Sequence, residues 1–140
     1  MSENDIEELR SRFAREAMAL MERTGEEVTR TRLAAELKVA RARVETVFPE
    51  EGDLLDAITA EWFAPKLAVM DEVMGSDLPP RRKMYEFFAS RFRLLRKNFH
   101  DDPATFNLYV EMGERYFDYA RSYIDLADHY LCELIAEAQA

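Results

Sequence analysis

Five basic side chains near the start of the sequence could together bind an anion. They occur between Val28 and Val44, accompanied by one acidic residue, Glu36, and they are Arg30, Arg32, Lys38, Arg41 and Arg43. Guanidinium and ammonium groups donate hydrogen bonds to phosphate oxygens, and arginine also donates to the edge of guanine. The whole chain of 140 residues carries a net charge of −9, so this stretch is a basic island in an acidic protein. Composition leaves two interpretations open, an anion-binding surface or a solvated helix face.

The apolar residues around the basic island predict three helices. Apolar side chains recur at spacings of three and four, which predicts helices over 6–22, 32–37 and 41–47. Thr29 or Thr31 is the expected N-cap of the second helix. Gly25 is the expected end of the first helix, and Pro49 follows the third.

The last two of these helices have the pattern of a helix-turn-helix. Ala34 is small enough for two helix backbones to approach each other, and the other expected contact positions are apolar: Leu33, Leu37, Val39, Val44 and Val47. A helix short enough to enter a major groove is not stable alone and must be braced by the helix before it. The pattern therefore predicts a DNA-reading helix over 41–47, braced by the helix over 32–37.

The outward side chains of this motif have the chemistry needed to contact DNA. If Val44 and Val47 point inward, Arg41 and Arg43 can donate to guanine or phosphate, and Ala42 can contact a thymine methyl group. Thr46 can bond to either kind of group, and arginines at the start of the bracing helix would meet the DNA backbone. The predicted DNA-binding residues are Thr29, Arg30, Arg32, Lys38, Arg41, Ala42, Arg43 and Thr46.

The remainder of the chain is also predicted to be helical. Apolar periodicity predicts a helix over 54–73 with Pro65 inside it, another over 81–99, and helical structure over 104–140 with Gly113 as a joint. No sustained period-two alternation predicts a strand. We therefore expect an all-α protein of about seven helices. A three-helix helix-turn-helix domain would occupy 1–52 and a helical ligand-binding and dimerisation domain 53–140.

Aromatic and methionine side chains are numerous in the second predicted domain. They could line a pocket for a flat or apolar ligand, since such pockets are mostly apolar with few polar groups. The simpler interpretation is that they form the core. The pocket prediction comprises Trp62, Met70, Phe88, Phe92, Phe106, Tyr109, Met112 and Tyr116.

Sequence features of an enzyme, a metal site or a membrane protein are weak here. His100 with Asp101 and Asp102 is best interpreted as a turn with a capping aspartate, and the single cysteine, Cys132, as a core residue. No glycine-rich phosphate loop, nucleophile elbow or paired-cysteine site is present. No apolar run approaches the roughly 20 residues that span a bilayer, and the acidic start differs from a signal peptide. We expect a cytoplasmic non-enzyme with no metal or cofactor.

The first 60 residues resemble the DNA-binding domain of the TetR family of bacterial regulators. The resemblance covers Phe13 to Leu55 and rests on these positions: Phe13, Ala17, Leu20, Gly25, Thr29, Leu33-Ala34, Val39, Phe48 and Asp53-Leu54-Leu55. It implies a homodimer that binds a double-stranded operator and represses transcription until a small apolar or aromatic effector releases it.

Four positions depart from the family's usual pattern. Lys38 replaces the turn glycine, Ala40 replaces a capping serine, and Glu45 and Glu51 replace residues that contact phosphate. The family also usually continues into further helices that form the dimer, so we expect a truncated chain, a different dimer surface, or a protein that no longer needs a dimer. The alternative hypothesis is a TetR-fold interaction or ligand-binding protein that has lost operator binding.

Overall fold

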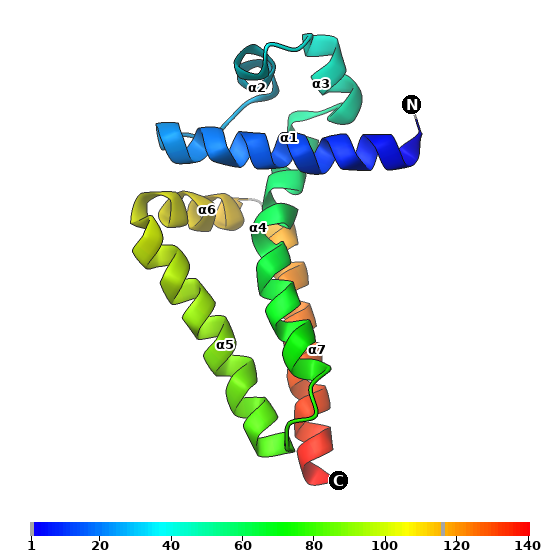
Figure 1. The fold of residues 1–140 in the computed structure, drawn as a ribbon, viewed down its shortest axis with the longest axis vertical. Helices are drawn as coiled ribbons and strands as arrows, with labels where there is room; N and C mark the ends of the chain where they lie inside the picture. The colour runs from blue at the N-terminus through cyan, green and yellow to red at the C-terminus, as the bar shows by residue number, and fades with distance from the viewer. Residues whose placement is uncertain (1, 116) are drawn as a thin grey trace. The chain divides into compact units, whose positions relative to one another are not determined.

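The computed structural model describes residues 2–115 and 117–140, with the side chains of Phe117 and Tyr119 outside that description. These residues form seven α-helices joined by short connections (Figure 1). The helices are α1 (Glu3–Thr24), α2 (Arg30–Leu37), α3 (Arg41–Val47), α4 (Glu51–Met74), α5 (Pro80–Asp101), α6 (Pro103–Arg115) and α7 (Phe117–Gln139). The all-α prediction is confirmed.

Several helix bounds differ from those that the sequence predicts. α2 begins at Arg30 because Thr29 is its N-cap, and α4 already begins at Glu51. α6 continues through Gly113 to Arg115, so the predicted joint at Gly113 is wrong. A single glycine inside a helix lowers its stability without ending it when the neighbours pack well.

The chain folds into two compact units, residues 1–61 and 62–140. α4 begins in the N-terminal unit and continues into the C-terminal unit. The functional domains predicted from sequence, 1–52 and 53–140, remain predictions. Among the residues that the structure describes, none of the helices combines the length and apolar character required to cross a bilayer.

In the N-terminal unit, α1 packs against both α2 and α3. Ser2 caps α1 through a capping box with Asp5, and Gly25 ends the helix with a left-handed φ of 71°. The core of the unit contains completely buried apolar side chains from α1, α3 and α4, among them Ala17, Met21, Val44, Val47 and Leu54. This packing holds the short α2 and α3, which could not persist as isolated helices.

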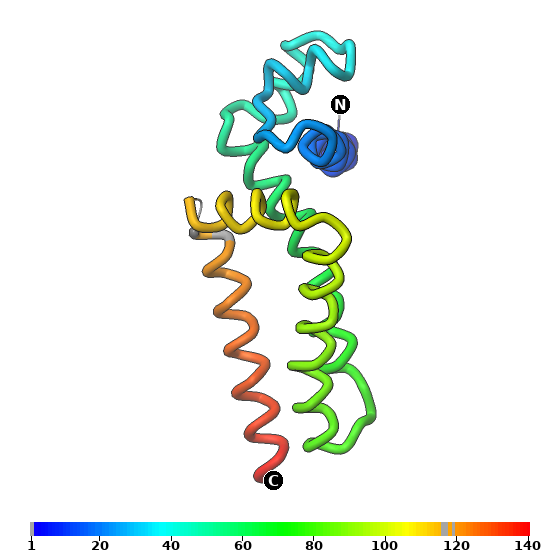
Figure 2. The backbone as a smooth tube through the Cα atoms, turned by 90° about the vertical axis from the view of Figure 1, so that its left-hand side faces the viewer, coloured from blue at the N-terminus to red at the C-terminus, as the bar shows by residue number. Residues whose placement is uncertain are grey.

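In the C-terminal unit, α5 and α7 lie side by side (Figure 2) and both pack against α6. Pro80 occupies the first turn of α5, where a missing N–H leaves no hydrogen bond unmade. The buried cluster of this unit consists of Met70, Val73, Phe87, Ala127 and Leu134. Cys132 is exposed on α7, so its assignment to the core was wrong.

Candidate nucleic-acid interface

The geometry of α2 and α3 is that of a helix-turn-helix. The Arg32 backbone N–H donates to Thr29 Oγ1 at 3.2 Å, which caps α2. Leu33 and Ala34 of α2 are buried, as are Val44 and Val47 of α3. Leu37 and Val39, the other predicted contact positions, are half-buried. The predicted bracing of α3 by α2 is therefore present, and α2 packs closely against α3.

The turn between these helices includes a strained residue. Lys38 adopts φ 55° and ψ 40°, the left-handed region, and its backbone N–H bonds to the carbonyls of Ala34 and Ala35. For a residue with a Cβ, this conformation lowers the stability of the fold by about 1 kcal/mol. Ala40, the N-cap of α3, makes no side-chain cap bond. Both departures from the family pattern thus keep the geometry of the motif at a cost in stability.

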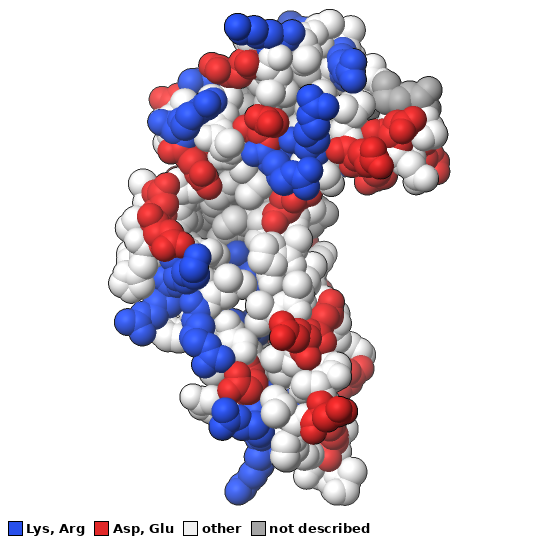
Figure 3. All heavy atoms as spheres, in the orientation of Figure 1, with Lys and Arg blue, Asp and Glu red and all other residues white. Residues whose placement is uncertain are grey.

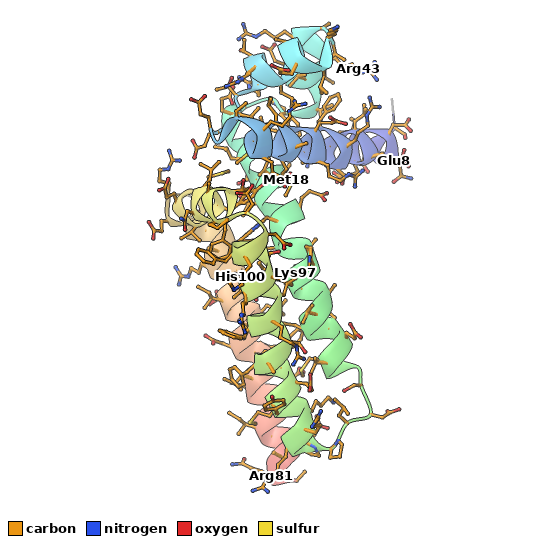
Figure 4. All side chains as sticks on the ribbon, turned by 60° about the vertical axis from the view of Figure 1, so that its left-hand side comes forward. Glu8, Met18, Arg43, Arg81, Lys97 and His100 are labelled. Atoms are coloured by element: carbon orange, nitrogen blue, oxygen red, sulfur yellow. The ribbon has the colours of Figure 1, made fainter. Side chains whose placement is uncertain are left out.

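Burial of Val44 and Val47 leaves the opposite side of α3 exposed. Arg41, Ala42 and Thr46 lie on that exposed side, and so does Arg43 (Figure 4). The Thr46 hydroxyl donates to the Ala42 carbonyl at 2.8 Å, so its oxygen remains available as an acceptor. The four side chains predicted to contact bases or phosphates from α3 are thus on one helix and open to solvent.

Three of the predicted arginines are paired with carboxylates. Arg41 Nε lies 2.8 Å from Glu45 Oε1, one turn away on the same helix. Arg32 Nη1 lies 3.1 Å from Glu26 Oε2. Both pairs are largely exposed, and exposed pairs are worth at most about 1 kcal/mol. A phosphate or base edge could therefore compete for these two arginines.

Arg30 has a different role, because its side chain is only 18% exposed. Its Nε lies 3.0 Å from Glu51 Oε1, and its Nη1 donates to the carbonyls of Phe48 and Pro49 at 3.0 and 2.6 Å. The Glu51 carboxylate also accepts from the Arg30 backbone N–H at 3.2 Å. Arg30 therefore links the start of α2 to the end of α3 and the start of α4. It would have to give up these contacts before its side chain could bind DNA.

Two carboxylates that the sequence analysis did not include in the site, those of Asp5 and Glu8, line the same hollow as Arg43. A shallow hollow of about 360 Å³ between α1 and α3 is lined by Asp5, Glu8, Leu9, Arg12 and Arg43. Figure 3 shows acidic and basic side chains interspersed over this unit. Asp5 and Glu8 lie more than 30 positions before Arg43, so only the fold brings them close. The only sequence feature that pointed to these carboxylates was the acidic character of the first ten residues.

The residues predicted to line a ligand pocket differ in their burial and contacts. Trp62 stacks on Tyr109 at 5.3 Å and meets Phe106 edge-on at 6.2 Å, the distances being between ring centroids. Met112 is buried and Met70 belongs to the α4–α5–α7 cluster. Phe88 and Phe92 are exposed on α5. Tyr116 lies outside the described residues.

Two hollows among the described residues of the C-terminal unit are lined by residues outside the pocket prediction. One, of about 170 Å³, is apolar and lined by Phe63, Leu67, Ser122, Tyr123 and Leu126. The other, of about 350 Å³, is open and more polar, with Arg82 and Glu86 among its lining residues. Tyr109, the aromatic residue of the pocket prediction that is buried, belongs to the hydrophobic core of this structure.

A buried lysine lies beside the aromatic stack. Lys66 is 3% exposed, and its Nζ donates to the Trp62 carbonyl at 3.1 Å and lies 3.6 Å from the centroid of the Trp62 ring. Cation–π attraction partly offsets the loss of hydration. Burial lowers the pKa of Lys66 to about 8. No sequence pattern marked this residue, because burial depends on tertiary packing.

The histidine–carboxylate cluster has a structural role at Asp102. This carboxylate accepts from the Thr105 hydroxyl at 2.6 Å and from the Thr105 backbone N–H at 3.1 Å, which caps the first turn of α6. The hydrogen bond from the Thr105 hydroxyl, followed by the one from its backbone N–H, holds the pKa of Asp102 below its usual range. Within the described residues, no group of three His, Cys, Asp or Glu side chains is placed to hold a metal ion.

A comparison with known domain families finds one match in the C-terminal unit. Residues 80–140 match the family described as tetracyclin repressor-like, C-terminal domain. This match supports membership of the chain in the TetR family. The N-terminal resemblance and this match cover different parts of the sequence and agree. No curated protein matches the chain. A tetracyclin repressor-like C-terminal domain suggests a regulator of this family.

Proposed function

We propose that this TetR-family protein is a cytoplasmic transcriptional repressor. In this proposal a homodimer binds a double-stranded operator through α3, and a small apolar or aromatic effector bound in the C-terminal unit releases it. The observation that carries the proposal is the exposed side of α3, where Arg41, Ala42, Arg43 and Thr46 face solvent while Val44 and Val47 anchor the helix. Such a braced helix with outward arginines suits a major groove.

Arg43 is the strongest candidate for a base contact. Arg41 must leave Glu45 before it can donate to a base, whereas Arg43 lies at the open hollow beside α1. Arginine binds the O6 and N7 atoms of guanine with two hydrogen bonds, worth about 1–3 kcal/mol of discrimination. Asp5 and Glu8 set a local negative potential that DNA phosphates must overcome.

The test is selection from a random pool of double-stranded DNA, at low and at near-physiological salt, followed by affinity measurements on the selected sequence. We expect a palindromic sequence to be enriched. The double variant Arg41→Ala/Arg43→Ala should then lose about a hundredfold in affinity. The matched control is Arg82→Ala/Arg93→Ala, which removes the same charge from side chains paired with Glu86 in the C-terminal unit. Equal losses of DNA affinity in both double variants would mean that α3 has no specific role in operator binding.

A second candidate function has its own supporting observation. Arg30, Arg32 and Arg41 are all paired with carboxylates, and Asp5 and Glu8 lie near Arg43. A chain that kept the TetR fold for ligand or protein binding, and lost operator binding, would show this neutralised surface. Weak binding that salt abolishes, with no enriched sequence, would favour this candidate over the repressor.

A further inference from the structure

Two arginines of the helix-turn-helix are held by carboxylates at the surface of the N-terminal unit. Arg32 Nη1 lies 3.1 Å from Glu26 Oε2, and Arg41 Nε lies 2.8 Å from Glu45 Oε1. The two arginine side chains are 39% and 64% exposed. Residues 1–61 contain 15 aspartates and glutamates against 9 lysines and arginines. The unit that includes the reading helix therefore has an excess of negative charge, and part of that charge lies directly on the arginines.

Helix stability does not explain these two pairs. Arg41 is the first residue of α3 and Glu45 lies in its last turn, so both charges oppose the helix dipole. Arginine before glutamate is also the weaker order for a pair four residues apart. Glu26 lies between α1 and α2, where its backbone N–H donates to Thr24 Oγ1 at 3.3 Å. Exposed pairs of this kind add little to folding, so their main effect is on the electrostatic potential of the surface.

An arginine paired in this way contributes little to sequence-independent DNA binding. Such binding depends on the number of phosphates whose charge the protein neutralises, and on the cations that the DNA then releases. An arginine that stays with its carboxylate adds no net positive charge. An arginine that exchanges its carboxylate for a phosphate leaves that carboxylate free to repel the DNA. In both cases the gain in affinity is small.

We propose that Glu26 and Glu45 act as intramolecular counterions of Arg32 and Arg41, and so suppress the binding of this unit to DNA of arbitrary sequence. At an operator, hydrogen bonds from Arg41 to guanine can outweigh its pair with Glu45. The inference rests on the proposed function in one respect, that α2 and α3 are the surface that meets DNA.

Arg43 is the arginine of α3 that keeps its charge available. It forms no ion pair among the residues that the structure describes, although Asp5 and Glu8 line the same hollow (Figure 4). The Asp5 carboxylate accepts from the Ser2 backbone N–H at 3.2 Å, as part of the capping box of α1. With Arg32 and Arg41 neutralised, the affinity of the wild type for DNA of arbitrary sequence should be weak and should depend little on salt.

The first test measures the affinity of the full chain for a duplex of arbitrary sequence at salt concentrations from about 50 to about 200 mM. Glu26→Gln/Glu45→Gln should bind this duplex about tenfold more tightly than the wild type at the lowest salt. The slope of log affinity against log salt should steepen by about 0.9 for each released arginine that contacts a phosphate. The matched control, Glu16→Gln/Glu22→Gln, makes the same change of charge on exposed side chains of α1 and should change both quantities much less.

The second test removes both members of one pair. Arg41→Gln/Glu45→Gln has the net charge of the wild type, so its affinity for the arbitrary duplex should stay within about threefold of the wild-type value. Glu45→Gln alone should raise that affinity, because Arg41 is then free to bind phosphate. All of these side chains are at least partly exposed, and circular dichroism can verify that each variant keeps its fold.

Two results would overturn the proposal. One is a Glu26→Gln/Glu45→Gln chain that binds the arbitrary duplex no more tightly than the wild type at every salt concentration. The other is a loss larger than about threefold in Arg41→Gln/Glu45→Gln, which would mean that Arg41 already contacts phosphates in the wild type. Because both tests use DNA of arbitrary sequence, failure of the operator selection would count against the repressor alone. An enriched operator with carboxylate variants that behave as the wild type would count against the counterions alone.

Discussion

Two arginines of the helix-turn-helix differ in whether the fold leaves their side chains available to bind DNA. Arg30 and Arg43 are both basic residues of the helix-turn-helix, yet Arg30 bonds to Glu51, Phe48 and Pro49, whereas Arg43 lines an open hollow. The sequence predicted the same chemistry for both. Glu51 lies 21 positions from Arg30, so a pattern confined to the motif could not show that this arginine was already engaged.

Lys66 makes the stability of the protein depend on pH. Its folded pKa of about 8 is below the ordinary value of 10.5, so below pH 8 the folded state carries the full cost of burying the charge. Between pH 8 and 10.5 the folded protein releases the proton that the unfolded chain still holds, and the free energy of unfolding rises. We expect a gain of up to about 3 kcal/mol from this group.

The measurement is urea unfolding of the wild type and of Lys66→Met across this pH range. Lys66→Met should be more stable at pH 7, since an apolar side chain replaces a buried charge, and its advantage should shrink as pH rises past 8. Lys97→Met removes the same charge from an exposed pair with Asp101 and should show no such trend. A constant difference between Lys66→Met and wild type would contradict the lowered pKa.

At the scale of elements, the turn between α2 and α3 stores strain that one substitution can relieve. Glycine adopts the left-handed conformation of Lys38 without the Cβ penalty. Lys38→Gly should therefore raise the free energy of unfolding by about 0.5–1 kcal/mol, after the added flexibility of the unfolded chain is subtracted. Thermal or urea unfolding measures the change.

The matched control for the turn is Glu36→Gly. This exposed residue lies inside α2, where glycine lowers stability by about 1 kcal/mol. The same new residue two positions apart should therefore have opposite effects. A loss of stability in Lys38→Gly would mean that the Lys38 side chain contributes more than its backbone conformation costs.

The existence of the helices was more predictable than their ends or their outer faces. The period of the apolar residues predicted α3 with the bounds observed, and Thr29 and Gly25 delimit α2 and α1 as expected. Gly113 and Cys132 were misjudged because residue type is a weak guide where packing decides. Phe88 and Phe92 were predicted to line a pocket, yet both rings face solvent.

At the scale of the whole molecule, pairing of copies would link stability to protein concentration. If unfolding dissociates the dimer, each tenfold rise in concentration adds about 1.4 kcal/mol to the stability of the dimer. We expect the melting temperature of the wild type to rise by roughly 2–4 °C per tenfold increase. Calorimetry or circular dichroism over two decades of concentration measures this slope. A melting temperature of the wild type that is independent of concentration would indicate that dissociation is not coupled to unfolding.

The sequence by itself determined the all-α class, the helix-turn-helix and the resemblance to the TetR family. These depend on local periodicity, capping residues and small-residue positions, all of which act over a few turns of helix. The tertiary structure alone decided that Arg30 is bound to Glu51, that Lys66 is buried and that Phe88 and Phe92 of α5 are exposed. Those outcomes depend on contacts between residues far apart in sequence, which a local pattern cannot specify.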